Sequence, residues 1–527
     1  MRNGKTRVLL VYPEIPRSFW DFKAAIRILG LDSTMPPLGL ATIAAMLPQE
    51  YFEMRPIIDL NFRTLEDGDI LWADVVMISA MLVQSESVRQ IIEHTKRLHK
   101  TTIVGGPFPT SYRDEVLAMG ADILILGEAE ITLRPFIEDW ICRREQRVYD
   151  EATLRSRSSV ELNAEGKPAI TTTPIPLWHL LEMGRYSSMA VQFSRGCPFD
   201  CEFCDIVNLF GHAPRVKTSA QMIAEIESIR VTGWRGSIFI VDDNFIGNRK
   251  GVQLFLIELL KWQESHGFPF SFFTEASINL ANDDMKEILD LMVRAGFEEV
   301  FIGIESNNPE VLARMGKRQN KGDLSEKVAS IQRAGLNVTA GFIIGADGDS
   351  ATAFPAMFSF IQDNGIVFAM LGLMTAIRGT RLYTRLKEEG RLRYESSGNN
   401  THQFKLNFDP TMNESALIKG YVRLLSELYS REHYYDRCRT LQKRLGHGTK
   451  RASQINWRYA RAMLRVLYYN LIECPDWEFV RFIVMTVCTH PNKFPEAISE
   501  AAKFRHLREI TETTVANYHL ENWLQNE

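Results

Sequence analysis

The chain has 527 residues, of which 45% are hydrophobic and 24% are charged, and its formal net charge is -4. This length predicts two to four domains, and the near-neutral charge argues against a protein dedicated to binding nucleic acid. No apolar run approaches the roughly 18 residues of a membrane-spanning helix, and the N-terminus lacks the apolar core of a secretory signal. Because four of the seven cysteines stand alone, we expect reduced thiols in a cytoplasmic protein rather than a disulfide framework.

Residues 1–145 are predicted to form a doubly wound α/β domain. Four short runs rich in β-branched residues (7–13, 73–80, 101–107 and 121–130) are typical of buried parallel strands. Between them, segments 37–47 and 87–100 carry the spacing of apolar residues expected for helices. In such a domain a ligand lies at the carboxyl ends of the strands.

Residues 146–185 lose this alternation and are predicted to be a linker. Six further strand-like runs then begin at residues 189, 237, 270, 299, 337 and 366, with helical stretches between them. They predict a partial (βα)6 barrel over residues 186–398, with functional side chains at the carboxyl ends of its strands. The strand signals then fade, and residues 399–527 are predicted to form an α-helical domain.

Cys197, Cys201 and Cys204 form a C-x3-C-x2-C motif directly after the first strand of this barrel. A structural zinc site commonly recruits four protein ligands in two spaced pairs, and His212 is the nearby candidate for a fourth ligand. Ordinary iron–sulfur electron carriers also use four cysteines. Three thiolates leave one iron of a cluster open to a small molecule, and we favour this interpretation over a zinc loop.

The cysteine motif and its place in the barrel resemble the radical S-adenosylmethionine (SAM) superfamily, over roughly residues 186–394. In that family the open iron of a [4Fe-4S] cluster binds the amino and carboxylate groups of SAM, and one electron cleaves SAM to a 5'-deoxyadenosyl radical. The resemblance implies that the three cysteines are catalytic and ligate the cluster. It also implies that Phe203, just before the last cysteine, lies near the adenine.

Polar groups follow the next strands, where this family places its SAM pocket. Taken singly, each carboxylate is more often a solvated loop acid, but their recurrence at successive strand ends favours the pocket. The resemblance implies contacts to SAM from Asp242 and Asp243 after the second strand, Glu275 and Ser277 after the third, Glu305 after the fourth, and the Ile344 backbone after the fifth. After the sixth strand, Arg378 replaces the usual proline of a P-G-T-x-L-Y segment, and either reaches the substrate or caps a helix.

The N-terminal domain lacks the G-x-G-x-x-G signature of dinucleotide binding after its first strand. Segments 35–47, 79–85, 105–110 and 127–130 instead resemble the cobalamin-binding branch of radical SAM enzymes. The resemblance implies corrin contacts from Ser79, Gly105, Gly106, Gly127 and Glu128. The two adjacent glycines allow a flat ring to approach the backbone, although a tight strand-to-helix turn is the alternative reason for them.

The signature of cobalamin proteins that supply a histidine to cobalt, D-x-H-x-x-G, is absent. Asp59 is followed by Leu60 and Asn61, and Phe108 stands where relatives often have histidine. We therefore expect base-off cobalamin, with water or no ligand on the lower face of the cobalt. Such a weak lower ligand favours movement of an upper methyl group.

Residues 437–465 contain nine Lys or Arg residues and no acid, with Trp457 and Tyr459 among them. Basic residues beside an aromatic and aliphatic face suit an anionic membrane surface, so a peripheral contact at the inner membrane surface is one interpretation. A solvated basic helix on an ordinary domain is the alternative.

The whole chain resembles the subgroup of cobalamin-binding radical SAM enzymes that includes hopanoid C-2 methylases, especially in segments 233–248 and 273–281. This implies a methyltransferase that acts on an unactivated carbon of a small-molecule or lipid substrate, with a flavodoxin- or ferredoxin-like electron donor. The cofactors supply the difficult chemistry, and the protein fixes distances and excludes water. The alternatives are a cobalamin-dependent cyclase or ring-rearranging enzyme and, in another class, a non-catalytic cobalamin or redox sensor.

Overall fold

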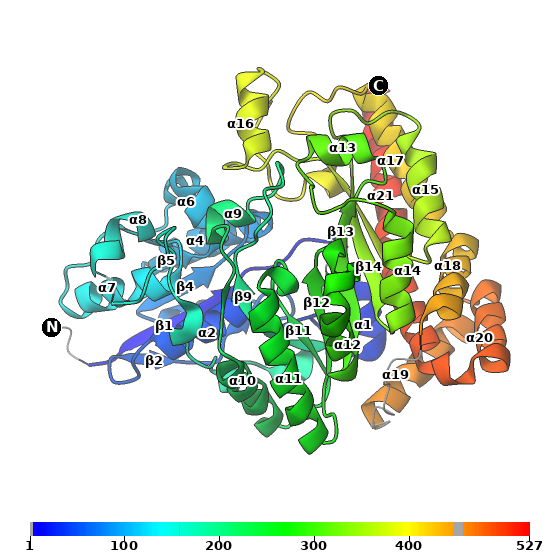
Figure 1. Ribbon diagram of the computed structural model, residues 1–527. Coiled ribbons are helices and arrows are strands. Elements are labelled where there is room, and N and C mark those ends of the chain that lie inside the picture. The colour runs from blue at the N-terminus through cyan, green and yellow to red at the C-terminus, as the bar shows by residue number, and fades with distance from the viewer. Residues whose placement is uncertain (1–3, 20, 158, 447–456, 527) are drawn as a thin grey trace.

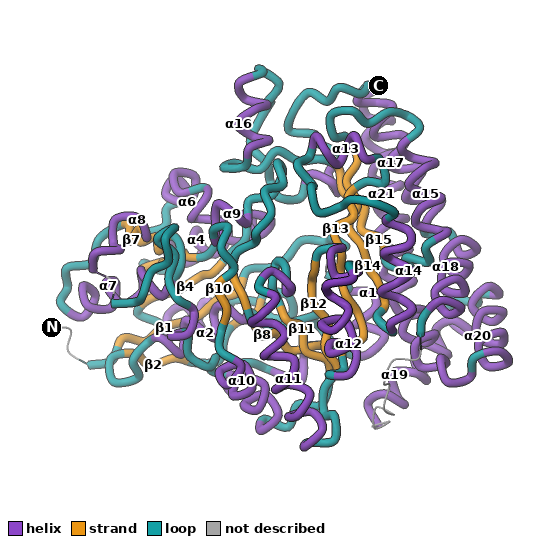
Figure 2. Tube along the Cα trace, in the orientation of Figure 1, coloured by secondary structure: helices purple, strands orange, loops and turns teal. Residues whose placement is uncertain are grey.

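Two parallel sheets stand side by side in the protein, and a group of helices covers the far side of the second sheet (Figure 1). The structure is a computed structural model that describes all residues except 1–3, 20, 158, 447–456 and 527. Figure 2 shows the strands gathered into these two sheets, with helices and loops around them. This arrangement confirms the predicted fold class of an α/β domain, a partial barrel and a helical C-terminal region.

The N-terminal sheet has seven parallel strands in the order β2-β1-β4-β5-β6-β7, with β3 also paired to β1. Its order runs outward on both sides of β1, as in a doubly wound domain. The strands are β1 (Thr6–Tyr12), β2 (Phe52–Met54), β3 (Ile58–Asp59), β4 (Val75–Ser79), β5 (Thr101–Gly105), β6 (Ile123–Leu126) and β7 (Val148–Asp150).

The helices of this region are α1 (Lys23–Leu29), α2 (Leu38–Met46), α3 (Asp67–Trp72), α4 (Ser85–Arg97), α5 (Pro107–Ser111), α6 (Arg113–Met119), α7 (Ala129–Ile141) and α8 (Glu151–Leu154). α1 departs from the others, because it packs on C-terminal helices instead of its own sheet. In Figure 1 the blue α1 lies beside the red α21. His506 contacts Phe22 with ring centroids 5.0 Å apart, across most of the chain.

The segment predicted as a linker still carries part of the first sheet, since β7 and α8 lie inside residues 146–185. Short 3-10 turns follow at Ile170–Thr172, Trp178–Leu180 and Met183–Arg185. The domain boundaries themselves remain predictions.

The second sheet has six parallel strands in sequential order, β8-β11-β12-β13-β14-β15. Because each strand pairs with the next one along the chain, the sheet curves into the predicted partial barrel. The strands are β8 (Ser188–Val191), β11 (Ser237–Ile240), β12 (Ser271–Ala276), β13 (Phe297–Glu305), β14 (Asn337–Ile344) and β15 (Ala369–Leu373). A short antiparallel ribbon, β9 (Ser194–Arg195) with β10 (Arg215–Val216), stands at its edge.

The barrel helices are α9 (Ile206–Phe210), α10 (Ser219–Val231), α11 (Arg249–Ser265), α12 (Lys286–Arg294), α13 (Pro309–Arg314), α14 (Leu324–Ala334), α15 (Ala353–Asp363) and α16 (Arg381–Glu388). Side chains alternate along the strands of the first sheet, and the two faces enter different cores. Leu9 and Val76 belong to a core beneath α4 and α6, whereas Val8 and Met77 join a core that continues into the barrel. The core on the Val8 and Met77 face is therefore common to both sheets.

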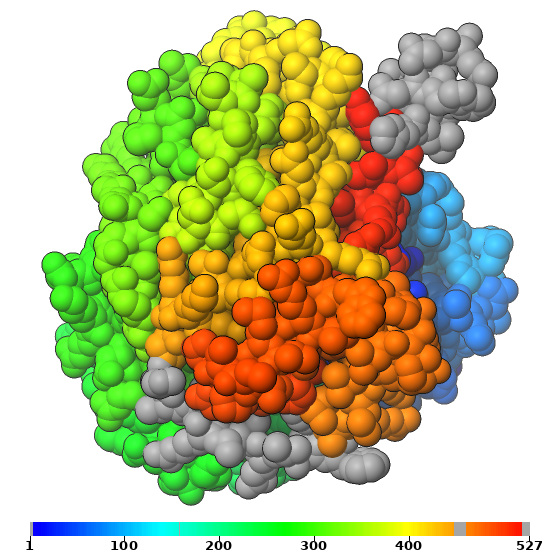
Figure 3. All heavy atoms as spheres, turned by 90° about the vertical axis from the view of Figure 1, so that its right-hand side faces the viewer, coloured from blue at the N-terminus to red at the C-terminus, as the bar shows by residue number. Residues whose placement is uncertain are grey.

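The C-terminal helices are α17 (Glu414–Leu428), α18 (Arg431–Arg444), α19 (Trp457–Tyr468), α20 (Trp477–Thr489) and α21 (Phe494–Asn526). Figure 3 looks onto the side that these helices cover. α17 ends at Leu428, and Ser430 caps α18 by accepting from His433 N. No helix among the described residues is both long enough and apolar enough to cross a membrane.

Candidate active site

The cysteine motif forms a loop between β9 and α9, and its three thiols are free and partly buried. Gly196 has a φ of 97°, and a Cβ there would lie 2.9 Å from the carbonyl oxygen of Ala213, so only glycine fits. The Cys197 amide donates to Gly211 O at 3.2 Å, which closes the base of the loop. Burial raises the pKa of Cys197 to about 11 and that of Cys204 to about 12.

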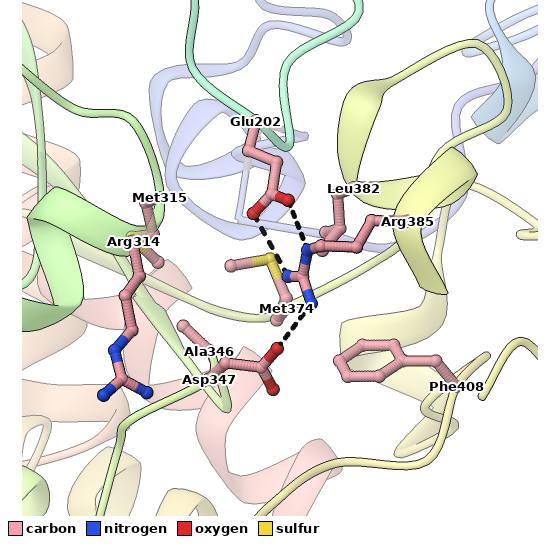
Figure 4. A pocket seen from close by; sticks show the side chains of 9 residues that line it. All are labelled: Glu202, Arg314, Met315, Ala346, Asp347, Met374, Leu382, Arg385 and Phe408. Carbon is pink, nitrogen blue, oxygen red and sulfur yellow. Dashed lines mark hydrogen bonds and ion pairs between the residues drawn. The ribbon is translucent and has the colours of Figure 1, made fainter. Parts of the chain in front are cut away.

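A second set of contacts holds the loop from the barrel side. The Glu202 amide donates to Met315 O at 2.8 Å, and its carbonyl accepts from the Leu382 amide at 2.9 Å. Figure 4 shows Arg385 of α16 between the Glu202 and Asp347 carboxylates, with nitrogen–oxygen distances of 2.6 and 2.8 Å. These groups line a small cavity of about 20 Å³. α16 thus fixes the loop between its second and third cysteines.

The three thiols do not form a compact site for one ion. Among the described residues, no three His, Cys, Asp or Glu side chains gather as ligands of a metal ion would. His212, the candidate fourth ligand of a zinc loop, is exposed, and its backbone amide donates to Glu165 at 3.0 Å. The donors suit a cluster, because Gln319 Nε2 also donates to Cys201 Sγ at 3.5 Å and hydrogen bonds to the sulfurs tune such clusters.

Three predicted carboxylates converge where the barrel strands end. Burial, followed by the repulsion of Asp242, raises the pKa of Asp243 to about 7. Burial and the repulsion of Asp243 likewise raise the pKa of Glu275 to about 8. The Glu275 carboxylate makes no hydrogen bond to a described residue, whereas the Glu305 carboxylate pairs with Lys317. This cluster of acids in a buried site is typical of a site that awaits a polar ligand.

Lys317, which is not among the residues predicted from the sequence, brings a positive charge to this acidic cluster. Its Nζ lies 2.6 Å from Glu305 Oε1 and 5.7 Å from the centroid of the Phe203 ring. Burial disfavours the charge of Lys317, but Glu305 and the Cys201 thiol outweigh this effect and raise its pKa. A Cβ at Gly303 would lie 2.4 Å from Glu305 Oε1, so the missing side chain makes room for the pair.

The other residues predicted to contact SAM, Asp242, Ser277 and Ile344, form hydrogen bonds within the protein. Asp242 is buried and uses both oxygens within the protein, accepting from Phe193 N at 2.8 Å and from Ser194 Oγ at 2.7 Å. Burial raises its pKa to about 6. The Ser277 amide donates to Asn244 Oδ1 at 3.0 Å. The Ile344 side chain lies in the core and its carbonyl accepts from the Met374 amide, so Asp242 and Ile344 have less freedom to meet a ligand than Asp243 or Glu275.

A larger cavity of about 420 Å³ separates the carboxyl ends of the N-terminal strands from the barrel. All five residues predicted to contact a corrin line it: Ser79, Gly105, Gly106, Gly127 and Glu128. Apolar side chains of α2 and β4 and the barrel residues Gln192, Arg195, Lys217 and Val241 complete the wall.

The glycines of this wall are needed for its shape. Gly106 has a φ of 96°, and a Cβ there would lie 2.9 Å from Ala80 O. Phe108, at the position that is often histidine, is buried in the core beneath the sheet and does not line the cavity. Asp59 accepts from Asn61 Nδ2 and from Tyr186 OH at 3.0 Å. The backbone at Gly105 and Gly106 therefore carries no side chain that would keep a flat ring away from this wall of the cavity.

Four charged side chains connect the two sheets beside the cavity. Glu128 accepts from Arg195 Nη1 at 2.8 Å and from Arg215 Nη1 at 2.9 Å, and Arg195 also reaches Glu130 at 3.0 Å. Burial opposes the charge of Glu130, but Arg195 lowers its pKa to about 2. Glu128 thus uses its carboxylate to hold the two sheets together, and its partner Arg195 stands two residues before Cys197.

Arg378 caps no helix, since Thr380 is the N-cap of α16. Its guanidinium pairs with Glu115 and Glu395 and lies 4.7 Å from the centroid of the Tyr112 ring. Arg378 is therefore a second connection between the N-terminal domain and the barrel.

Comparisons with known proteins agree with this arrangement. Residues 26–137 match the B12 binding domain, residues 191–361 the Radical SAM superfamily, and residues 380–519 a domain of unknown function, DUF4070. A Synechocystis protein named Uncharacterized methyltransferase sll1242 is 44% identical over 82% of this chain and 77% of its own. The hopanoid C-2 methylase of Rhodopseudomonas palustris is 32% identical over 89% of this chain and 87% of its own.

A solved structure shares the fold. The radical SAM methyltransferase TsrM of Kitasatospora setae, with cobalamin and a [4Fe-4S] cluster bound, superposes with a TM-score of 0.60 at 15% identity. The superposition covers 83% of this chain and 99% of TsrM.

Proposed function

This chain belongs to the family of cobalamin-dependent radical SAM methyltransferases, and we propose that it methylates an unactivated carbon of an apolar polycyclic lipid such as a hopanoid. The observation that carries the substrate class is the 32% identity to the hopanoid C-2 methylase, which extends through all three regions of the chain.

The protein uses a [4Fe-4S] cluster, SAM and cobalamin. We propose that Cys197, Cys201 and Cys204 hold the cluster and that the wall around Gly105 and Gly106 holds the corrin. When bound, the cluster supplies the electron that splits SAM, and the corrin carries the methyl group for transfer.

The acidic cluster is proposed to bind and orient SAM. Glu275, whose pKa is raised to about 8, keeps its proton at neutral pH and can donate a hydrogen bond to a hydroxyl group. The Glu305 carboxylate pairs with Lys317 through Oε1, so its other oxygen can accept from a hydroxyl or an amino group. Burial of these groups excludes water from the reacting site.

The test is anaerobic turnover of the reconstituted protein with methyl-labelled SAM and extracted lipids, followed by mass spectrometry. We expect a lipid product that gains one labelled methyl group, and none with Cys201→Ala. A Cys142→Ala variant should keep the activity, because Cys142 is an exposed thiol outside the motif. A cyclase would change the substrate without adding label, and a labelled water-soluble product would contradict the lipid assignment.

We propose a small electron-transfer protein of the flavodoxin or ferredoxin kind as the reductant. Formation of 5'-deoxyadenosine should then depend on adding such a donor with its reductase, in place of a chemical reductant. Equal rates without any donor protein would contradict this.

A further inference from the structure

The most apolar part of the surface lies on α19, α20 and the turn between them. Among the described residues, fifteen large hydrophobic side chains are exposed, and eight of these fall within residues 464–487. This apolar patch consists of Leu464, Tyr468, Leu471, Ile472, Trp477, Val484, Met485 and Val487. Trp477 is 81% exposed and Ile472 64%. Soluble proteins rarely gather such side chains at one place without a binding role.

The patch follows the helical repeat. Leu464, Tyr468, Leu471 and Ile472 recur at spacings of four, three and one, so they share one side of α19 and its continuation. In α20 the same spacing places Trp477, Arg481, Val484 and Met485 on one side. The opposite side of α20, with Phe479 and Phe482, is buried against α18. α20 is therefore apolar on both sides, which is unusual for a surface helix.

The charges around the patch are mainly positive. Arg461 of α19 is exposed and forms no ion pair with a described residue, and Arg481, within the stripe of α20, lies 3.6 Å from Glu478. The Arg465 guanidinium instead lies against Gly30 at the end of α1. The acids nearby are largely engaged, since Asp476 pairs with Arg431 and Glu478 pairs with Arg439. Glu473 is the exposed acid at the turn.

The basic stretch 437–465 does not itself make such a surface. Arg437 is fully buried, bonded to Gln362 and Leu428 O, and Arg439 pairs with Asp436 and Glu478. Residues 447–456 and the side chains of Trp457 and Tyr459 lie outside the described part of the structure. The exposed apolar groups lie further along the chain than the sequence suggested.

We propose that the apolar patch on α19 and α20 docks the protein on the surface of an anionic lipid bilayer. The aliphatic side chains and Trp477 would enter the boundary between headgroups and acyl chains, where tryptophan is favoured. Arg461 and Arg481 would meet the lipid phosphates. This gives a role to part of the region that matches only a domain of unknown function, and it holds whatever the substrate is.

Charge favours a bilayer over a second copy of the chain as the occupant. A symmetric dimer through this patch would bring Arg461 and Arg481 of both copies close together, with the exposed Glu473 at the turn to offset them. Anionic headgroups instead neutralise the arginines and cover the apolar stripe. Figure 3 shows the orange and orange-red atoms of α19 and α20 next to each other on this side of the protein.

The test is co-sedimentation of the full-length reconstituted protein with vesicles of phosphatidylcholine alone or mixed with phosphatidylglycerol. We expect the wild type to sediment with the mixed vesicles, less so in high salt. The double variant Val484→Glu/Met485→Glu should bind about tenfold or more weakly, because two apolar groups no longer enter the lipid. Arg461→Ser/Arg481→Ser should lose the preference for phosphatidylglycerol.

The matched control is Val231→Glu/Leu254→Glu, which changes two exposed apolar side chains on α10 and α11. This variant should bind vesicles as the wild type does. The proposal is overturned if the wild type stays in the supernatant with both kinds of vesicle, or if the control loses binding equally. It is also overturned if the wild type is a dimer that the α20 double variant converts to a monomer. Unchanged circular dichroism and melting temperature establish that each variant is folded.

Discussion

Arg195 reaches across from the barrel to the N-terminal domain and holds Glu128, with Nη1 2.8 Å from Oε2. Glu128 is buried and Arg195 is mostly buried, and Arg215 contacts the same carboxylate. Arg195 stands two residues before Cys197, and Glu128 lines the cavity assigned to the corrin. One ion pair therefore connects the two cofactor regions directly.

Removing this carboxylate should loosen the junction. We expect Glu128→Ala to lower the free energy of unfolding by about 3–5 kcal/mol, because buried guanidinium groups lose a partner. Urea unfolding of the cofactor-free protein measures this, and cobalamin retention should fall in parallel. The control is Glu138→Gln, which breaks the exposed pair with Arg134 and should cost less than about 1 kcal/mol. Equal effects of the two variants would contradict a special role for Glu128.

Lys317 should matter through its pairing with Glu305. Lys317→Met leaves a buried carboxylate uncompensated and should destabilise the protein by about 3–5 kcal/mol. The double variant Lys317→Met/Glu305→Gln should recover much of this loss, since no unpaired charge remains. Lys321→Met is the matched control on the same loop, because Lys321 is exposed. If the double variant is no more stable than Lys317→Met, the pair is not what stabilises this loop.

The raised pKa of Glu275, about 8, predicts how stability depends on pH. The folded protein keeps this proton to a higher pH than the unfolded chain does. The contribution of protonated Glu275 to the stability of the folded protein is therefore complete below the usual pKa range of glutamate. It is lost as the pH rises through about 8. Melting temperatures of the cofactor-free protein should fall between pH 6 and pH 9 more steeply for the wild type than for Glu275→Gln. Parallel profiles would show that Glu275 is ionised throughout.

Gly106 is expected to be intolerant of a side chain. Gly106→Ala combines a positive φ with a contact of 2.9 Å to the Ala80 backbone, so it should cost at least about 1 kcal/mol and impair cobalamin binding. Absorbance of the bound corrin and thermal melting together measure both effects. The control is Gly39→Ala. Gly39 lines the same cavity, but a Cβ there would lie no closer than 3.8 Å to a neighbouring atom, so this variant should fold normally. Normal cobalamin binding by Gly106→Ala would show that this wall moves without cost.

The strands that carry the site were predictable because each is a short apolar run ending in a polar or small residue. The loop of Cys197 to Cys204 and the acids Asp243, Glu275 and Glu305 follow from such runs and from their spacing. These residues could be placed from local sequence patterns, because the carboxyl ends of all strands in a parallel barrel lie at the same edge.

Lys317 could not be found in this way. It lies in an irregular loop after α13, twelve residues beyond Glu305, and nothing in its neighbourhood distinguishes it from a surface lysine. Only the return of that loop over the barrel brings the two charges together. The burial of Arg437 and the docking of α1 on distant helices likewise depend on tertiary contacts that no local pattern records.

The position of α1 bears on how the chain is made. Phe19 O accepts from the His506 ring 487 residues away, so the neighbour of α1 leaves the ribosome long after α1 itself. At ordinary rates of synthesis the delay is roughly 25–100 s, during which Ile26 and Ile28 have no permanent cover. A chaperone that shields this short helix until translation reaches α21 would raise the yield of folded enzyme, and pausing late in the message would lower it.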